Sequence, residues 1–116
     1  MSDHQRFIRR AIAVARKGVD QNLGGPFGAV VVKDGRIIAE AHNEVTSSCD
    51  PTAHAEVVAI RKACKALNSY QLEGCIVYAS CEPCPMCLGA IYWARPLKLY
   101  YASSKADASK IDFDDG

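Results

Sequence analysis

Three regularly spaced cysteines carry the strongest chemical signal in the chain. Cys81, Cys84 and Cys87 stand three residues apart in the stretch CEPCPMC. His54 and Glu56 stand upstream, in the stretch TAHAEVVAI. Zinc favours thiolate sulfur and imidazole nitrogen, and a catalytic zinc ion takes three protein ligands and keeps a fourth position for water. These residue types therefore indicate a redox pair, a structural zinc site or a catalytic zinc site.

The spacing of Cys84 and Cys87 suits two ligands on one helical turn. Residues three apart on a helix share a face, so both sulfur atoms can point the same way. Pro85 fits the first turn, where its missing N–H leaves no bond unmade. A helix N-terminus also carries partial positive charge, which favours the thiolate form of both cysteines.

His54 is the expected third ligand, and Glu56 is the expected proton carrier. In an α/β sheet, functional groups gather at the carboxyl ends of parallel strands, where helices begin. A helix beginning near His54 and the helix of the cysteines should therefore meet at one edge. At a first helical turn, His54 can hold the metal while the Glu56 carboxylate reaches the activated water and shuttles its proton.

Two other interpretations of the cysteines stay open at this point. A C-x-x-C pair such as Cys81 and Cys84 is typical of redox dithiols, but it gives the HAE stretch no role. A closed structural zinc site would use Cys81 as a fourth ligand beside His54, Cys84 and Cys87. That arrangement leaves no room for water and gives Glu56 no function.

Length and composition limit the remaining choices. The 116 residues predict a single domain spanning 1–116. No stretch approaches ~18 consecutive apolar residues, and charged residues interrupt the N-terminus, so neither a membrane span nor a secretory signal is expected. A reducing cytoplasmic setting follows from the compartment rule for cysteines. The net charge of +1 argues against nucleic acid as the main partner.

The other cysteines and histidines have ordinary interpretations. Cys64 and Cys75 lie in apolar stretches, where a reduced cysteine packs as a small hydrophobe. His4 and His42 are expected to be hydrogen-bonded or solvated side chains without a catalytic role.

Apolar periodicity predicts an α/β chain of three helices and four strands. Helices are expected at 4–17, at about 53–67 and at 86–94. Strands are expected on both sides of Asp34-Gly35 within 29–43, at 75–80 and at 97–103. Gly18 is expected to stop the first helix, and Asp50 or Thr52 to cap the second. The alternation predicts a parallel sheet with helices on both faces, followed by a polar, acidic tail.

The chain resembles the cytidine/deoxycytidylate deaminase-like superfamily and, within it, the bacterial guanine deaminases. The zinc stretches match the H-x-E…P-C-x-x-C pattern of zinc nucleobase deaminases. Further likeness lies in GGPFGAVVVKDG, in IYWARP and in the terminal FDD. The resemblance implies a three-layer cytidine deaminase-like fold, with a mixed sheet and helices on both faces. It also implies His54, Cys84 and Cys87 as zinc ligands and Glu56 as the proton shuttle.

The resemblance further implies which residues contact a purine. Asn43 would hold the ring, and Phe27 and the backbone of Ala55 would border the base. Asp115 would assist proton transfer and contact the amino group, with its neighbour Asp114 as a further contact. Trp93 would line the pocket, and packing of its helix on the sheet is the alternative role.

Hydrolytic deamination of guanine to xanthine and ammonia is the implied reaction. A tRNA adenosine deaminase or another nucleobase or nucleoside deaminase, and an inactive zinc-binding module, are the alternatives. The resemblance implies a homodimer whose subunits exchange a C-terminal segment of some forty residues. This chain stops after FDD, so the fold is expected to be C-terminally short and to lack the family's last strand and helices. Closure of the pocket over a substrate is then in question.

Overall fold

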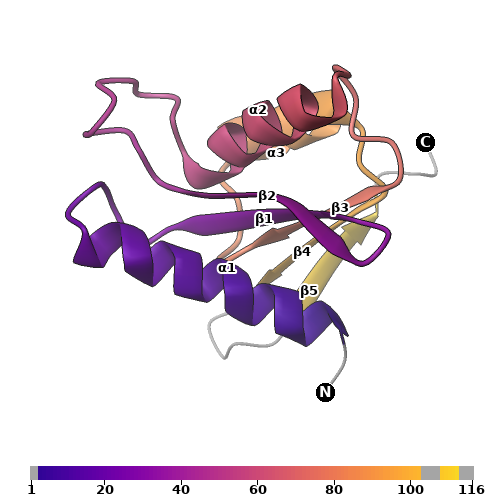
Figure 1. Cartoon of the computed structure of the whole chain (residues 1–116), viewed down its shortest axis with the longest axis horizontal. Helices are drawn as coiled ribbons and strands as arrows, with labels where there is room; N and C mark the ends of the chain where they lie inside the picture. The colour runs from indigo at the N-terminus through magenta and orange to yellow at the C-terminus, as the bar shows by residue number, and fades with distance from the viewer. Residues whose placement is uncertain (1–2, 103–107, 113–116) are drawn as a thin grey trace.

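The computed structural model describes residues 3–102 and 108–112 as three helices and five strands. In chain order they are α1 (Asp3–Asp20), β1 (Gly28–Lys33), β2 (Arg36–His42), α2 (Ala55–Leu67), β3 (Cys75–Ala79), α3 (Pro85–Ala94), β4 (Lys98–Ala102) and β5 (Ala108–Asp112). The strands form one sheet in the order β2-β1-β3-β4-β5. Helix α1 covers one face, and α2 with α3 covers the other (Figure 1). The three-layer α/β fold with a mixed sheet is thus confirmed.

Strand direction decides where the helices begin. β1 is antiparallel to both β2 and β3, and β4 is parallel to β3. β2, β3 and β4 therefore run in the same direction. The chain leaves the carboxyl end of β2 toward α2 and the carboxyl end of β3 toward α3, so both helices begin at the same edge of the sheet.

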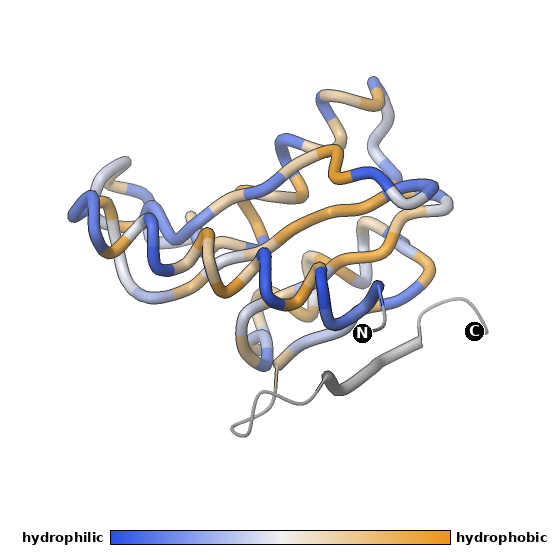
Figure 2. The backbone as a smooth tube through the Cα atoms, turned by 60° about the horizontal axis from the view of Figure 1, so that its bottom comes forward, coloured by the Kyte–Doolittle hydropathy of each residue, from blue (hydrophilic) through white to orange (hydrophobic). Residues whose placement is uncertain are grey.

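Two apolar layers result from alternation along the strands. Val30 on β1 and Tyr78 on β3 pack with Phe7 on the α1 side. Their neighbours Val31 and Val77 pack with α2 and α3 on the other side. Figure 2 shows the hydrophobic colour running almost unbroken along the central strands, as expected for strands that are buried on both faces.

Glycine allows α1 to lie close to the hairpin of β1 and β2. A Cβ atom at Gly18 would lie 2.8 Å from Cβ of His42. The prediction that Gly18 ends the helix is wrong, because α1 continues to Asp20 and this glycine serves close packing instead. At Gly28 a Cβ atom would lie 2.2 Å from the Ala11 carbonyl oxygen.

The hydrogen bonding expected for His4 and His42 is confirmed. His4 lies between two tyrosines, with Nδ1 2.7 Å from the Tyr78 hydroxyl and Nε2 3.1 Å from the Tyr100 hydroxyl. These hydrogen bonds attach the start of α1 to β3 and β4. His42 places Nδ1 3.2 Å from the Asn43 carbonyl oxygen.

The cap of α2 differs from the prediction. His54 is the N-cap residue, and it makes no side-chain capping bond. Asp50 instead accepts hydrogen bonds from the Thr52 amide at 2.9 Å and the Thr52 hydroxyl at 2.7 Å. Both predicted caps therefore belong to the preceding turn. The polar groups close a local loop that delivers His54 to the helix start.

The structure adds a fifth strand that apolar periodicity does not predict. β5 pairs antiparallel with β4, from Lys98 opposite Asp112 to Ala102 opposite Ala108. Its sequence, ASKID, contains a single β-branched apolar residue, so alternation gives no signal. Backbone pairing along the open edge of β4 supplies the order that the pattern lacks. None of the described helices has a stretch long and apolar enough to cross a bilayer.

Crowding at Gly28 generates a stability prediction. Gly28→Ala should lower the free energy of unfolding by about 1–3 kcal/mol, because the new methyl group meets the α1 backbone rather than a movable side chain. Urea denaturation of the parent protein and the variant measures this change.

Gly89→Ala is the matched control, measured on the monomer, since no atom of the same chain lies within 4 Å of a Cβ atom there. Within α3 it should raise stability by about 0.5–1 kcal/mol. Equal effects of the two substitutions would contradict the close approach of α1 to β1.

Candidate metal centre and active site

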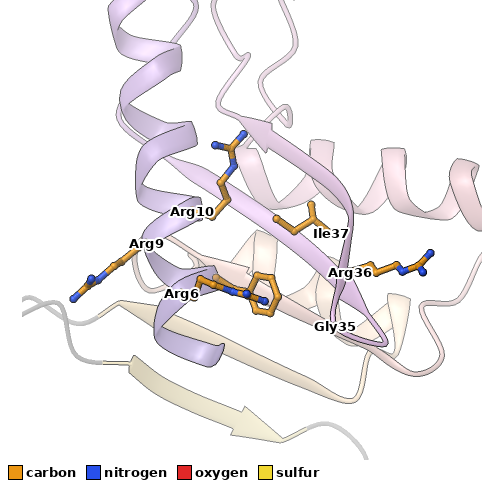
Figure 3. A pocket seen from close by; sticks show the side chains of 7 residues that line it. Arg6, Arg9, Arg10, Gly35, Arg36 and Ile37 are labelled. Carbon is orange, nitrogen blue, oxygen red and sulfur yellow. The ribbon is translucent and has the colours of Figure 1, made fainter. Parts of the chain in front are cut away.

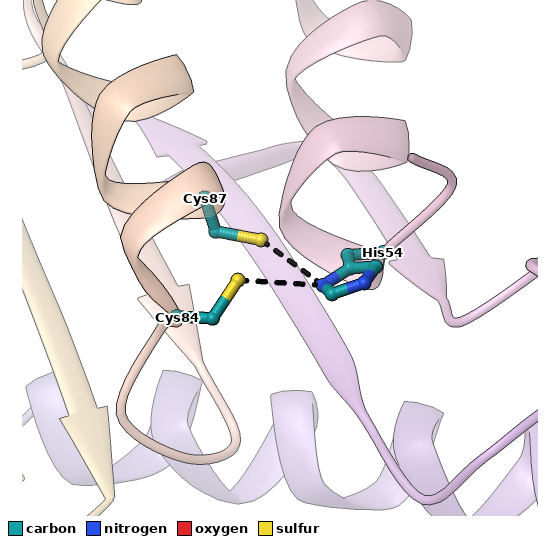
Figure 4. A group of neighbouring side chains, drawn as sticks. All are labelled: His54, Cys84 and Cys87. Carbon is teal, nitrogen blue, oxygen red and sulfur yellow. Dashed lines mark hydrogen bonds between the residues drawn. The ribbon is translucent and has the colours of Figure 1, made fainter. Parts of the chain in front are cut away.

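His54 and the two cysteines meet where α2 and α3 begin. His54 is the N-cap of α2, Cys84 is the N-cap of α3, and Cys87 lies in the first turn of α3. Pro85 occupies the first position of α3, as the spacing predicts. Figure 4 shows the imidazole between the two helices, with both sulfur atoms pointing toward it.

The distances fit a single tetrahedral ion. Nδ1 of His54 lies 3.6 Å from Sγ of Cys84 and 3.4 Å from Sγ of Cys87. Tetrahedral zinc, with bonds of about 2.3 Å to sulfur and about 2.0 Å to nitrogen, holds such atoms roughly 3.5 Å apart. The three residues therefore match zinc in ligand chemistry and in spacing.

Cys81 is not part of this cluster. Among the described residues, His54, Cys84 and Cys87 form the group whose ligand atoms all lie within 4.8 Å of one another, and Cys81 is outside it. Three protein ligands are the number typical of catalytic zinc, whereas structural zinc takes four. The geometry thus favours a catalytic site over the closed one.

The thiolate form of a buried cysteine needs a nearby positive charge. Burial raises the pKa of the Cys87 thiol well above its ordinary value, and the nearby Glu56 carboxylate raises this pKa further. A coordinated divalent ion would instead lower the pKa of the thiol, because a metal-bound thiol is deprotonated. Zinc binding and the charge state of this site are therefore strongly linked.

Glu56 lies in the same cavity as the metal cluster. The cavity has a volume of about 180 Å³ and is lined by Phe27, Asn43, His54, Glu56, Cys81, Glu82 and Cys84. The Glu56 side chain is only 6% exposed. Burial raises the pKa of its carboxyl group, against the lowering effects of its own backbone amide and of His54. A carboxyl group with a raised pKa is suited to take up and release protons near neutral pH.

Asn43 is held in a fixed orientation at the cavity wall. Its Oδ1 accepts a hydrogen bond from the Val45 backbone amide at 3.0 Å, and the backbone amide of Asn43 donates to the Phe27 carbonyl oxygen at 3.0 Å. With Oδ1 occupied, the side-chain NH₂ is the group left to donate toward a ligand. A Cβ atom at Gly24 would lie 2.1 Å from the Asn43 carbonyl oxygen, so Gly24 permits this packing.

Two further predicted residues, Ala55 and Trp93, are not among the described residues that line the cavity. Ala55 is fully buried at the start of α2, between His54 and Glu56. Trp93 is 77% exposed on α3 and is not among the described residues that line the cavity. Asp114 and Asp115 lie outside the described residues.

Two lining residues have no catalytic or substrate-binding role in the sequence-based assignment, which considered Cys81 only as a redox partner or a fourth zinc ligand. Cys81 and Glu82 both border the cavity, in the turn between β3 and α3. Their position between the end of a strand and the first cysteine of a helix is the signal that could have identified them. Ser80 fixes the start of this turn, because its hydroxyl accepts from the Gly28 amide at 2.9 Å.

Comparisons with known proteins agree with this chemistry. Residues 1–103 match the family described as the cytidine and deoxycytidylate deaminase zinc-binding region. Over 113 residues the chain is 64% identical to guanine deaminase of Bacillus subtilis (strain 168), covering 97% of this chain and 72% of that protein. Over 97 residues it is 42% identical to a tRNA-specific adenosine deaminase of Aquifex aeolicus (strain VF5), covering 84% of this chain and 64% of that protein.

The fold also matches that of a solved structure. The X-ray structure of the Bacillus subtilis guanine deaminase superposes with a TM-score of 0.86 at 66% identity, covering 89% of this chain and 65% of that chain. The chain therefore spans about two thirds to three quarters of the length of these relatives.

Loss of one thiolate generates a prediction for the metal centre. Cys84→Ser should lose zinc and stability together, because the ion contributes binding free energy only to the folded chain. At free zinc a hundredfold above the Kd of the parent protein, the loss should be about 3 kcal/mol. Metal analysis and thermal unfolding with and without added zinc measure both effects.

Cys49→Ser provides the control, since Cys49 is an exposed free cysteine outside the cluster. It should keep full zinc content and the parent melting temperature. Full zinc occupancy in Cys84→Ser would remove Cys84 from the ligand set.

Proposed function

The chain belongs to the cytidine and deoxycytidylate deaminase family, and from this premise we propose that it catalyses the zinc-dependent hydrolysis of guanine to xanthine and ammonia. The observation that carries the proposal is the convergence of His54, Cys84 and Cys87 beside the buried Glu56 in one cavity. The 64% identity to a guanine deaminase, against 42% to a tRNA-specific adenosine deaminase, favours guanine as the substrate.

Each protein group has a defined part in this reaction. Zinc, when bound, supplies a Lewis acid that makes water nucleophilic near neutral pH. The Glu56 carboxylate takes a proton from the attacking water as oxygen bonds to the amino-bearing ring carbon. It delivers this proton to the ring nitrogen. It then takes the second proton from the new hydroxyl group and passes it to the amino group as the C–N bond breaks, so that water and guanine yield xanthine and ammonia.

The cavity supports a free base as the substrate. Its volume of about 180 Å³ lies below the ~300–1,000 Å³ range usual for drug-sized ligands. The side-chain NH₂ of Asn43 can donate to an acceptor on the purine, and the ring of Phe27 can lie against its face. Ala55, Asp114, Asp115 and Trp93 are proposed as further substrate contacts on the resemblance alone.

A cytoplasmic location is also proposed. Two cysteines that must stay as thiolates to bind zinc are compatible with a reducing compartment, where disulfides are rare.

The outer face of α3 supports a homodimer. The sequence of α3, PMCLGAIYWA, has no charged residue, although the helix lies at the surface. Met86 and Trp93 are both exposed along it, and Tyr92 packs edge-on against Trp93. A helix that is apolar on all sides is usually covered, and aromatic residues are enriched at the centres of protein interfaces. We propose a second copy of the chain as the covering partner, with a C-terminal segment exchanged between the two copies.

A substrate panel tests the proposed reaction. Ammonia release should be fastest with guanine among guanine, adenine, cytosine, guanosine, adenosine and a tRNA anticodon stem-loop. Glu56→Gln should keep zinc and lower kcat by about 10²–10⁴-fold, because it removes the proton carrier.

Glu73→Gln, at an exposed position in the turn before β3, should leave both zinc content and kcat unchanged. Preference for the stem-loop over guanine would replace the proposed substrate with an RNA adenosine. Unchanged turnover in Glu56→Gln would remove Glu56 from the mechanism.

The proposed dimer generates a separate prediction. Trp93→Glu should weaken self-association by about thirtyfold, the ~2 kcal/mol of an interface hot spot, because it places a charge in an apolar contact. Sedimentation equilibrium measures the dissociation constant. Tyr70→Glu is the control, since Tyr70 is an exposed aromatic that lies between α2 and β3 rather than on α3. A monomeric parent protein would refute the dimer.

A further inference from the structure

Helix α3 has two faces with different surroundings. Its inner face is made by the buried residues Cys87, Ile91 and Ala94. Its outer face is made by exposed residues spaced three and four apart, Met86, Gly89 and Trp93. Met86 stands between the metal ligands Cys84 and Cys87 in the sequence. One helical turn therefore belongs to the metal centre on one side and to the outer face on the other.

The first turn of α3 lacks the usual capping interactions. Cys84 is the N-cap residue and makes no side-chain capping hydrogen bond, and the turn contains no acidic residue to match the helix dipole. The helix has ten residues, fewer than the ~12–15 that an isolated helix needs in water. The order of this turn therefore depends on the packing of the inner face and on an ion held by the two cysteines.

A bound ion would join the first turn of α3 to α2. His54, at the start of α2, places Nδ1 3.6 Å from Sγ of Cys84 and 3.4 Å from Sγ of Cys87. A zinc ion held by these three residues would fix the turn against the second helix. Met86 and Gly89 would be fixed with it, because they lie in the same turn or in the next one.

The surface on the α1 side is unsuited to a second copy of the chain. Figure 3 shows Arg9 extending from α1 on one side of a depression and Arg36 extending from β2 on the other. Arg6 and Arg10 line the same depression. A two-fold interface brings the same patch of both copies together, so these arginines would meet like charge. The outer face of α3 has no charged residue and avoids this repulsion.

We propose that zinc binding and self-association are linked through α3, so that each strengthens the other. The inference rests on the dimer proposed above, in which the second copy contacts the outer face of α3. Zinc would order the turn that completes this face. Linkage is reciprocal, and a dimer holds two ions, so zinc strengthens the dimer by the square of the factor by which dimerisation strengthens zinc binding at each site.

Zinc affinity measured against protein concentration tests the linkage. A chromophoric chelator of known affinity competes for the ion, below and above the dimer Kd that sedimentation equilibrium gives. The zinc Kd should fall about fivefold as the parent passes from monomer to dimer, the low end of usual coupling. The metal-free protein should then have a dimer Kd about 25-fold higher than the zinc-loaded protein. The first measurement suffices if the metal-free chain does not fold.

Two variants separate linkage from a direct effect on the metal centre. Trp93 is not among the described residues that line the cavity, so Trp93→Glu should have the zinc affinity of the parent monomer at every protein concentration. Tyr70→Glu, at an exposed position between α2 and β3, should follow the parent throughout. A merely local loss of structure in α3 would not depend on protein concentration.

Three outcomes overturn the linkage. Equal zinc affinity in the parent monomer and dimer would do so while leaving the metal centre and the dimer intact. Zinc affinity in Trp93→Glu below that of the parent monomer would assign the effect to α3 itself rather than to association. A monomeric parent would remove both the dimer and the linkage. Because no measurement uses turnover, these results are independent of the proposed reaction.

Discussion

The structure depends on one electrostatic constraint: two thiols, an imidazole and a carboxylate are gathered at the starts of two helices. Burial and the Glu56 carboxylate raise the pKa of the Cys87 thiol, and burial raises the pKa of Glu56 itself. Partial positive charge at the N-termini of α2 and α3 favours the charged forms of these groups. A divalent cation held by His54, Cys84 and Cys87 would lower the pKa of the thiols and would couple metal binding to folding.

The sheet makes this gathering possible without strain in the ligands. Because β2 and β3 run in the same direction, α2 and α3 begin at one edge, and their first residues become the ligands. The flanking ends of the hairpin add Phe27 and Asn43 to the same cavity, with Asn43 fixed by the Val45 amide and packed against Gly24. Rigid elements thus position each group, and the apolar layers on both faces of the sheet keep them in place.

The sequence predicts the metal centre better than its surroundings, for physical reasons. Cys84, Pro85 and Cys87 form a local signal, because helical spacing alone sets their geometry. The close packing of Gly18 on His42 is a tertiary contact, so the sequence suggested a helix stop instead. The pairing of β5 with β4 depends on an open backbone edge, which side-chain patterns do not encode. Cys81 and Glu82 line the cavity because the hydrogen bond from the Gly28 amide to the Ser80 hydroxyl sets the path of their turn, which is a tertiary contact. The exposure of Trp93 depends on the packing around α3, which the sequence of the helix does not give.

X-ray absorption spectroscopy of the zinc-loaded protein tests the central claim most directly, because it counts the atoms around the ion by element. Two sulfur neighbours at about 2.3 Å, with one imidazole nitrogen and one further light atom from solvent at about 2.0 Å, are the predicted set. A third sulfur neighbour would mean that Cys81 closes the site, and the catalytic account would then fail.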